Sequence, residues 1–272
     1  TAIKYLTSSA KQNNSDAQFI LGSIYYEGSV VVRDINKSKH YLSQSALQKN
    51  SSAEFLLGNI FYKEGKIDTA LDYLVKSADH GNSDAQFALG KIYIECLNKI
   101  RSSISYFVKS ANQGNNKAQF YLAYIYGTNR YITPNFKLSM KYLKLSADNN
   151  YKPAQEILGM YFYKNNNIKE AIKYLTQSAE KNAYARFALG YIYFENEDIP
   201  RDINTSLKYY MYSSNLSNPL AKNNLAVLYK NGDFGVKKNV CLAIEHFRKA
   251  IQISNDNFSL FNLAKIYYFG ID

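Results

Sequence analysis

Few residues in this chain could carry out covalent or metal chemistry. The histidines are His40, His80 and His246, and none has a second His or Cys three or four positions away, as a helical zinc site would need. The two cysteines, Cys96 and Cys241, lie far apart in the sequence and suit neither a disulfide framework nor a metal-ligand pair. We expect each cysteine to be a small buried hydrophobic side chain.

Other sequence signals of catalysis are also missing. The acidic segment at residues 195–198 could attract a cation, but it lacks the alternating oxygen ligands of a calcium loop. The sequence has no glycine-rich phosphate-binding loop and no G-x-S-x-G nucleophile motif. We therefore predict no catalytic residue, no metal and no cofactor, and a chain that is not itself an enzyme.

The composition is that of a folded helical protein. Of the 272 residues, 46% are hydrophobic and 15% aromatic, while only four are proline, so long stretches are free of helix breakers. No apolar run approaches the roughly 18 residues of a membrane span, and the segment does not open with a secretory leader. We expect no membrane insertion and, with reduced cysteines, a cytoplasmic location.

The net charge of +11 raises the question of nucleic-acid binding. Residues 1–136 carry 15 Lys and Arg against 10 Asp and Glu, and residues 137–272 carry 18 against 12. The positive excess is thus spread along the chain and forms no cluster, as expected of solvated helix faces. This distribution argues against nucleic acid as the partner.

An internal repeat organises the whole sequence. A pattern of Ala, Leu four residues later, Gly or Ala directly after that Leu, and an aromatic residue at the ninth position recurs every 31 to 38 residues. Counting each anchor as offset 0, the anchors are Ala17, Ala53, Ala85, Ala118, Ala154, Ala185, Ala221 and, in the same role, Ser259.

A second motif, Y-[L/F]-x-x-S-A, follows each anchor by about 20 to 25 residues. It begins at Tyr41, Tyr73, Tyr106, Tyr142 and Tyr174, with degenerate copies near Tyr209 and His246. One further copy, Tyr5-Leu6…Ser9-Ala10, precedes the first anchor.

These two motifs predict a pair of amphipathic helices in each repeat. Offsets 0, 4 and 8 form one apolar face of the first helix, and the small residues at offsets 0 and 5 allow the second helix to approach closely. One pair cannot bury its own apolar face, so neighbouring pairs must stack. We predict an all-α fold: a right-handed α-α superhelix, or solenoid, of about seven to eight stacked helix-turn-helix repeats.

The predicted array is a single domain over residues 1–272, with partial repeats at both ends. Solenoids normally end in polar capping repeats, and neither end of this segment has one. We expect the chain to belong to a larger polypeptide or complex.

The motifs resemble a known family. The segment AQFILGSIYYEG at residues 17–28, the second motif at Tyr41, and the intervening Val32-Arg33-Asp34 are similar to the Sel-one-like repeat of the tetratricopeptide-like superfamily. The segment at residues 199–202, Ile-Pro-Arg-Asp, resembles the basic-then-acidic loop of that family even more closely. Repeats two, three and five are shorter and resemble ordinary tetratricopeptide turns. The resemblance implies a protein-interaction scaffold whose first helices line a concave groove.

The opposite face of the first helices supplies the candidate binding residues. At 100° per residue, offsets 2, 6 and 9 lie opposite the packing face, and they are aromatic where a surface helix would be polar. Aromatic side chains suit peptide capture, while Asn and Lys could bind the peptide backbone and carboxylates. The predicted partner-binding residues are Phe19, Tyr26, Phe55, Asn59, Tyr62, Phe87, Lys91, Phe120, Tyr124, Tyr163, Phe187, Tyr191, Phe194, Lys265 and Tyr268.

Several interpretations remain open at the level of sequence. The Phe at offset 2 could pack against the next repeat instead of facing the groove, and we favour this packing role. The favoured function is a non-catalytic scaffold or adaptor that binds a protein or peptide segment. The alternatives are the regulatory array of a larger enzyme, such as a kinase, and a nucleic-acid-binding helical-repeat protein.

Overall fold

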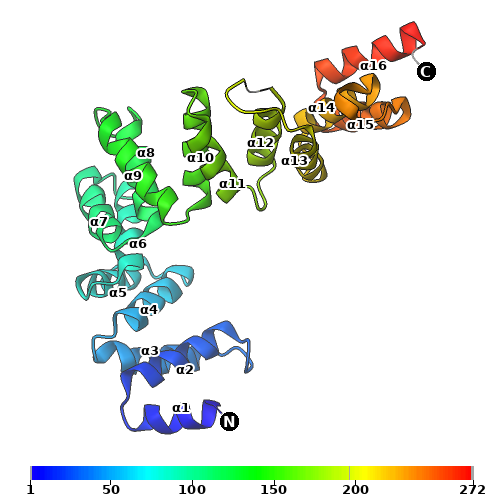
Figure 1. The fold of residues 1–272 in the computed structure, drawn as a ribbon. Coiled ribbons are helices and arrows are strands. Elements are labelled where there is room, and N and C mark those ends of the chain that lie inside the picture. Colours follow the sequence, from blue (N-terminus) through cyan, green and yellow to red (C-terminus); the bar gives the residue numbers. More distant parts are fainter. Residues whose placement is uncertain (1, 196, 271–272) are drawn as a thin grey trace. The chain divides into compact units, whose positions relative to one another are not determined.

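The computed structural model describes residues 2–195 and 197–270, and this part of the chain contains helices and no strand. The chain divides into two compact units at the junction between Asn149 and Asn150, and each unit is described by itself. Within each unit, helices that follow one another in sequence pack in antiparallel pairs (Figure 1). The predicted all-α repeat fold is confirmed, while a single array over 1–272 stays a prediction.

The first unit contains nine of these helices. Their bounds are α1 Ala2–Lys11, α2 Ser15–Glu27, α3 Ile35–Leu47, α4 Ser51–Lys63, α5 Ile67–Asp79, α6 Ser83–Glu95, α7 Ile100–Asn112, α8 Asn116–Gly127 and α9 Phe136–Asp148.

The second unit contains the remaining helices. Their bounds are α10 Lys152–Lys164, α11 Ile168–Ser178, α12 Ala183–Glu195, α13 Ile203–Asn215, α14 Pro219–Asn231, a short 3-10 turn at Asp233–Gly235, α15 Val240–Ser254 and α16 Asn257–Phe269. The even-numbered helices carry the first motif and the odd-numbered helices carry the second.

The first helices begin at a recurring asparagine. The side chain of Asn50 accepts a hydrogen bond from the backbone N–H of the anchor Ala53 at 3.1 Å, and Asn82 caps Ala85 in the same way at 2.9 Å. The second helices end at residues that adopt positive φ, as the sequence predicts, with 87° at Gly81 and 85° at Gly114. Each chain reversal is therefore specified locally.

The packing face of each first helix lies where the repeat places it. The anchor Ala17 is 4% exposed and Leu21 is fully buried, and the corresponding residues of the next first helix, Ala53 and Leu57, are both fully buried. A side chain on Gly22 would place its Cβ 2.6 Å from Cγ of Leu42 on the second helix. The small residue at offset 5 is thus required by close helix contact.

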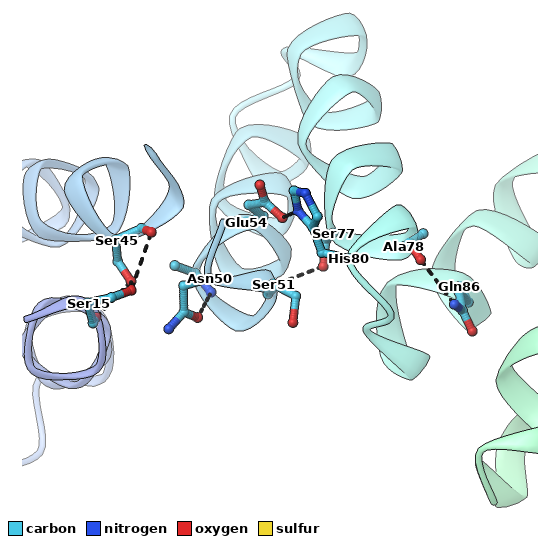
Figure 2. Close-up of polar contacts among 10 residues, drawn as sticks. Ser15, Ser45, Asn50, Ser51, Glu54, Ser77, Ala78, His80 and Gln86 are labelled. Carbon is cyan, nitrogen blue, oxygen red and sulfur yellow. Dashed lines mark hydrogen bonds and ion pairs between the residues drawn. The ribbon is translucent and has the colours of Figure 1, made fainter. Parts of the chain in front are cut away.

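Buried serines join the two helices of a repeat. The hydroxyl of Ser45 in the second motif donates to the backbone oxygen of Ser15 at 2.8 Å, and Ser77 donates to Ser51 at 2.7 Å (Figure 2). At the other end of the pair, Ser38 donates to the backbone oxygen of Gly22 at 2.8 Å. These bonds satisfy buried hydroxyls and fix the register of the two helices.

Stacked aromatic rings form a further contact within each repeat. The ring at offset 8 lies against the first aromatic residue of the second motif, with planes 3° to 19° apart. The pairs are Tyr25–Tyr41, Phe61–Tyr73, Tyr93–Tyr106, Tyr126–Tyr142, Phe162–Tyr174, Tyr193–Tyr209 and Tyr229–His246. The offset-8 position therefore belongs to the intra-repeat interface, as predicted.

The expectation that both cysteines are buried is wrong. Cys96 and Cys241 are free thiols with exposed side chains. Cys96 follows the last turn of α6, and Cys241 lies in the first turn of α15, so both fall beyond the apolar faces that pack these helices. In the described part of the chain, no helix is both long and apolar enough to cross a membrane.

Candidate functional site

The first unit has a groove on the exposed side of its first helices. It has a volume of about 420 Å³ and lies mainly between α4 and α6, with one residue from α8. The lining residues are Phe55, Asn59, Tyr62, Leu74, Asp84, Phe87, Ala88, Lys91, Ile92, Glu95, Cys96 and Lys117. Apolar walls with a few polar groups are typical of a ligand-binding groove.

Five of the residues predicted from sequence meet in this groove: Phe55, Asn59, Tyr62, Phe87 and Lys91. They occupy offsets 2, 6 and 9 of α4 and offsets 2 and 6 of α6. Successive turns of each helix thus present an aromatic ring next to a polar side chain. The geometry brings two neighbouring copies of the predicted stripe together.

The offset-2 rings serve both packing and the groove. Phe55 is half-buried against the cluster that contains Leu74 and Leu89 of the next repeat. Phe87 lies 5.4 Å from the ring of Tyr121 in an edge-to-face contact and 5.8 Å from Phe107. Both rings therefore join adjacent repeats, and their remaining exposed surface lines the groove.

The polar groups differ in their freedom to bind a ligand. The amide of Asn59 makes no hydrogen bond within the described residues, so its donor and acceptor can both serve a ligand. Lys91 lies 3.8 Å from Glu95, and both side chains remain well exposed. Such an exposed pair contributes little stability and can exchange partners readily.

Sequence reasoning missed the acidic and basic groups at one side of the groove. Asp84 and Lys117 stand one position before their anchors, and Glu95 lies at offset 10. At 100° per residue these positions adjoin offset 6, so a wider stripe would have included them. Asp84 accepts a hydrogen bond at 3.0 Å from the amide of Asn115, which caps the next first helix. That bond holds the carboxylate at the edge of the groove.

The other predicted residues of the first unit lie outside this groove. Phe19 is half-buried against the cluster of Leu42 and Leu57, and Phe120 is also half-buried. Tyr26 accepts a hydrogen bond from the amino group of Lys63 at 2.7 Å. Tyr124, which is 42% exposed, hydrogen-bonds Arg130, and this bond raises the pKa of the Arg130 guanidinium.

The predicted residues of the second unit form small aromatic groups. Tyr191 contacts Tyr163 and Phe187, each with ring centroids 6.4 Å apart, and burial, followed by the Tyr191 hydroxyl, raises the pKa of Tyr163. Phe194 lies 5.3 Å from Phe234. Lys265 and Tyr268 are exposed on α16, and Tyr268 is 83% exposed.

The arrangement in the α4–α6 groove is suited to recognition. Within residues 2–195 and 197–270, no cluster of three or more His, Cys, Asp or Glu side chains could hold a metal ion. Two aromatic walls, a free amide and four charges of mixed sign can accept an extended segment with apolar side chains and polar ends.

Comparison with known proteins identifies the family. The Sel1 repeat model matches residues 15–50, 51–82, 83–115, 116–151 and 219–254, and a tetratricopeptide repeat model matches residues 158–215. The chain belongs to the Sel1 repeat family. Repeats of the Sel1 and tetratricopeptide type are generally protein-interaction scaffolds. No curated protein matches the sequence significantly.

Two solved structures of Sel1-type proteins show the same fold. A protective antigen of uropathogenic Escherichia coli strains with an SLR fold is 26% identical, with a TM-score of 0.85 over 98% of this chain and 60% of the antigen. A Sel1 repeat protein from Oxalobacter formigenes is 23% identical, with a TM-score of 0.66 over 97% of this chain and 79% of that protein. The chain therefore spans less than two thirds of the first of these two proteins.

Proposed function

We propose that this Sel1 repeat protein is a non-catalytic scaffold that binds a partner segment in the groove between α4 and α6. The observation that supports the proposal is the convergence of Phe55, Asn59, Tyr62, Phe87 and Lys91 on one open groove. Aromatic rings provide contact area with little side-chain entropy to lose on binding.

The expected ligand is an extended peptide with an aromatic or aliphatic residue. That residue lies between the exposed edges of Phe55 and Phe87, and the amide of Asn59 hydrogen-bonds the peptide backbone. Lys91 and Lys117 favour a carboxylate near one end of the bound segment, while Asp84 and Glu95 disfavour a second one close by. The mixed charges thus set the orientation of the peptide.

A displayed library of random linear peptides, selected against the chain, tests this proposal. We expect Tyr62→Ala and Asn59→Ala each to weaken the selected peptides by about tenfold, the loss typical of an anchor in a binding interface. Tyr62 is 50% exposed, so its removal leaves the fold intact. Circular dichroism on each variant checks that helicity is retained.

Tyr184→Ala is the matched control, because this tyrosine is 64% exposed on a first helix outside the groove. Its variant binds as the unaltered chain does. Peptides whose affinity is indifferent to both groove variants, or lost equally in the control, would show that the groove is not the binding site.

A further inference from the structure

Helix α16 exposes a face that the other first helices bury. Its anchor Ser259 is fully buried, but Ala264 at offset 5 is exposed and Tyr267 at offset 8 is 57% exposed. The corresponding Gly22 is buried and Tyr25 is stacked beneath a second helix. Within the described residues, no second helix follows α16.

A pocket marks the place of the uncovered helix. It has a volume of about 620 Å³ and lies between the start of α15, at Val240 and Ile244, and the exposed face of α16, at Ile266 and Tyr267. Elsewhere a second helix packs on its own first helix and also on the cluster of the preceding repeat, as Tyr106 does on the cluster around Leu74. The pocket offers these two walls together.

Helix α1 presents the converse half of a repeat. It carries the complete second motif, Tyr5-Leu6…Ser9-Ala10, and no first helix precedes it within the described residues. Tyr5 is 71% exposed, while the motif tyrosines Tyr174 and Tyr210 are buried. Leu6 packs only partly, against the cluster of Ala17 and Leu21.

The state of Leu6 shows what is missing from α1. The equivalent Leu42 packs on Ala53 and Leu57 of the following repeat and is also covered by Gly22 of its own first helix, which leaves it fully buried. Leu6 has the first of these contacts and lacks the second. The uncovered side of α1 therefore matches the uncovered side of α16 in chemistry and spacing.

We propose that α1 of one copy of this chain docks on α16 of a second copy and completes a repeat between them. By the pattern of the intact repeats, Tyr5 stacks on Tyr267, Leu6 covers Ala264, and the hydroxyl of Ser9 donates to the backbone oxygen of Asn257. The last pairing follows the intact repeats, in which the motif serine bonds to the first residue of the first helix.

The contact joins two different surfaces, so it propagates. Each docked copy still exposes its own α16 to the next copy, which makes an open chain of molecules, or a ring if the rotation closes. The average mass should therefore rise with concentration and not stop at a dimer. Blocking either surface should reduce the mass to that of the 31.1 kDa monomer.

Sedimentation velocity over a series of concentrations tests the proposal. Ala264→Glu places a charge where Leu6 must pack, and Tyr5→Glu places one against Tyr267, so each variant alone should be monomeric. Both positions are exposed in the single chain, and the variants should fold normally. The controls Ser8→Glu and Lys265→Glu alter exposed neighbours on the other sides of the same helices and should still associate.

Mixing the two blocked variants gives a sharper result. The Tyr5→Glu chain keeps a competent α16 and the Ala264→Glu chain keeps a competent α1, so the mixture should form a dimer of twice the monomer mass and nothing larger. An unaltered chain that stays monomeric at every concentration overturns the proposal and leaves α16 to a helix of another origin. Association that survives either block overturns it too, because another surface is then responsible.

Discussion

At the scale of single residues, the position after each repeated leucine is the most restrictive in the sequence. Built on Gly90, a Cβ would lie 2.6 Å from Cε1 of Phe107, whose side chain is fully buried. The repeat that follows carries Ala123 and Leu143 at the equivalent positions. The residue size at offset 5 is thus matched to the side chain above it.

This matching predicts the effect of Gly90→Ala. Overpacking should destabilise the chain by about 2 kcal/mol, which exceeds the gain of about 1 kcal/mol from the better helix propensity of alanine. Urea denaturation followed by circular dichroism measures the loss. Adding Phe107→Leu recreates the Ala123–Leu143 pair and should recover most of it; a double variant no more stable than Gly90→Ala alone would contradict the packing explanation.

His246 is a second residue with a measurable consequence, because it replaces the motif tyrosine. Its ring stacks on Tyr229, its Nδ1 is buried without a hydrogen-bond partner among the described residues, and burial, followed by Lys222, lowers its pKa. The folded state therefore disfavours protonation relative to the unfolded state, whose pKa is about 6.5. The neighbouring charges of Glu245 and Lys249 act in opposite directions.

We expect the stability associated with His246 to be complete above pH 6.5 and to decline as the pH falls below that value. The variant His246→Tyr restores the usual motif and should remove this part of the acid sensitivity. Thermal unfolding between pH 8 and pH 5 (two values chosen to span the ordinary histidine pKa of about 6.5) makes the comparison. Equal acid sensitivity in the two proteins would assign the effect to other groups.

At the scale of elements, polar clamps connect each second helix to the first helices on either side. Gln86 donates to the backbone oxygen of Ala78 at 3.0 Å and accepts from Gln113 at 2.8 Å. Where that Gln pair would recur, the chain has Glu54, which is 2% exposed, and His80, with 2.7 Å between Oε2 and Nδ1 (Figure 2). The clamp is the same in position and differs in its titratable groups.

The Glu54–His80 clamp predicts a rescue experiment. His80→Ala leaves the buried carboxylate without its partner and should cost about 1–3 kcal/mol. The double variant Glu54→Gln with His80→Gln recreates the amide pair of the following repeat and should be more stable than His80→Ala. Chemical denaturation of the three variants, analysed as a double-mutant cycle with Glu54→Gln, gives the coupling between the two side chains.

Sequence reasoning succeeds best for the elements and less well for what lies between them. The spacing of Ala, Leu and the small residue predicts each first helix, its packing face and its partner, because one steric requirement recurs in every repeat. The clamp of Glu54 with His80 joins residues of different helices and becomes apparent only in three dimensions. The same is true of the groove: Phe55 and Phe87 are foreseeable from periodicity, whereas Asp84 and Lys117 line it from outside the assumed stripe.

Exposure near helix ends is the other weak point of the sequence prediction. Cys96 and Cys241 were expected in the core because cysteine is usually buried, but a side chain at a helix terminus can lie beyond the neighbouring helix. Tyr62 and Tyr26 share offset 9 and still differ, since Lys63 and the loop residue Arg33 both approach the ring of Tyr26. Local loop length therefore decides which ring is free.

At the scale of the whole molecule, the hydrophobic clusters divide in the same way as the chain. Each described cluster draws its residues from one side of the junction at 149–150: the cluster around Leu122 lies within the first unit, and the cluster around Leu189 within the second. Stability in a repeat protein is approximately a sum of each repeat and its nearest-neighbour contacts. Each unit therefore contains the contacts that stabilise it.

We accordingly expect residues 1–149 and 150–272, produced separately, to remain helical and to unfold cooperatively. Circular dichroism and thermal denaturation of the two fragments test this, with a cut inside a repeat, between α4 and α5, as the control. That cut separates Gly58 from Leu74, whose side chain would lie 2.8 Å from a Cβ on the glycine, and should yield fragments of low helicity. Fragments cut at 149–150 that unfold as readily as the control would show that stability depends on contacts across the junction, because no loss of an internal cluster could then account for it.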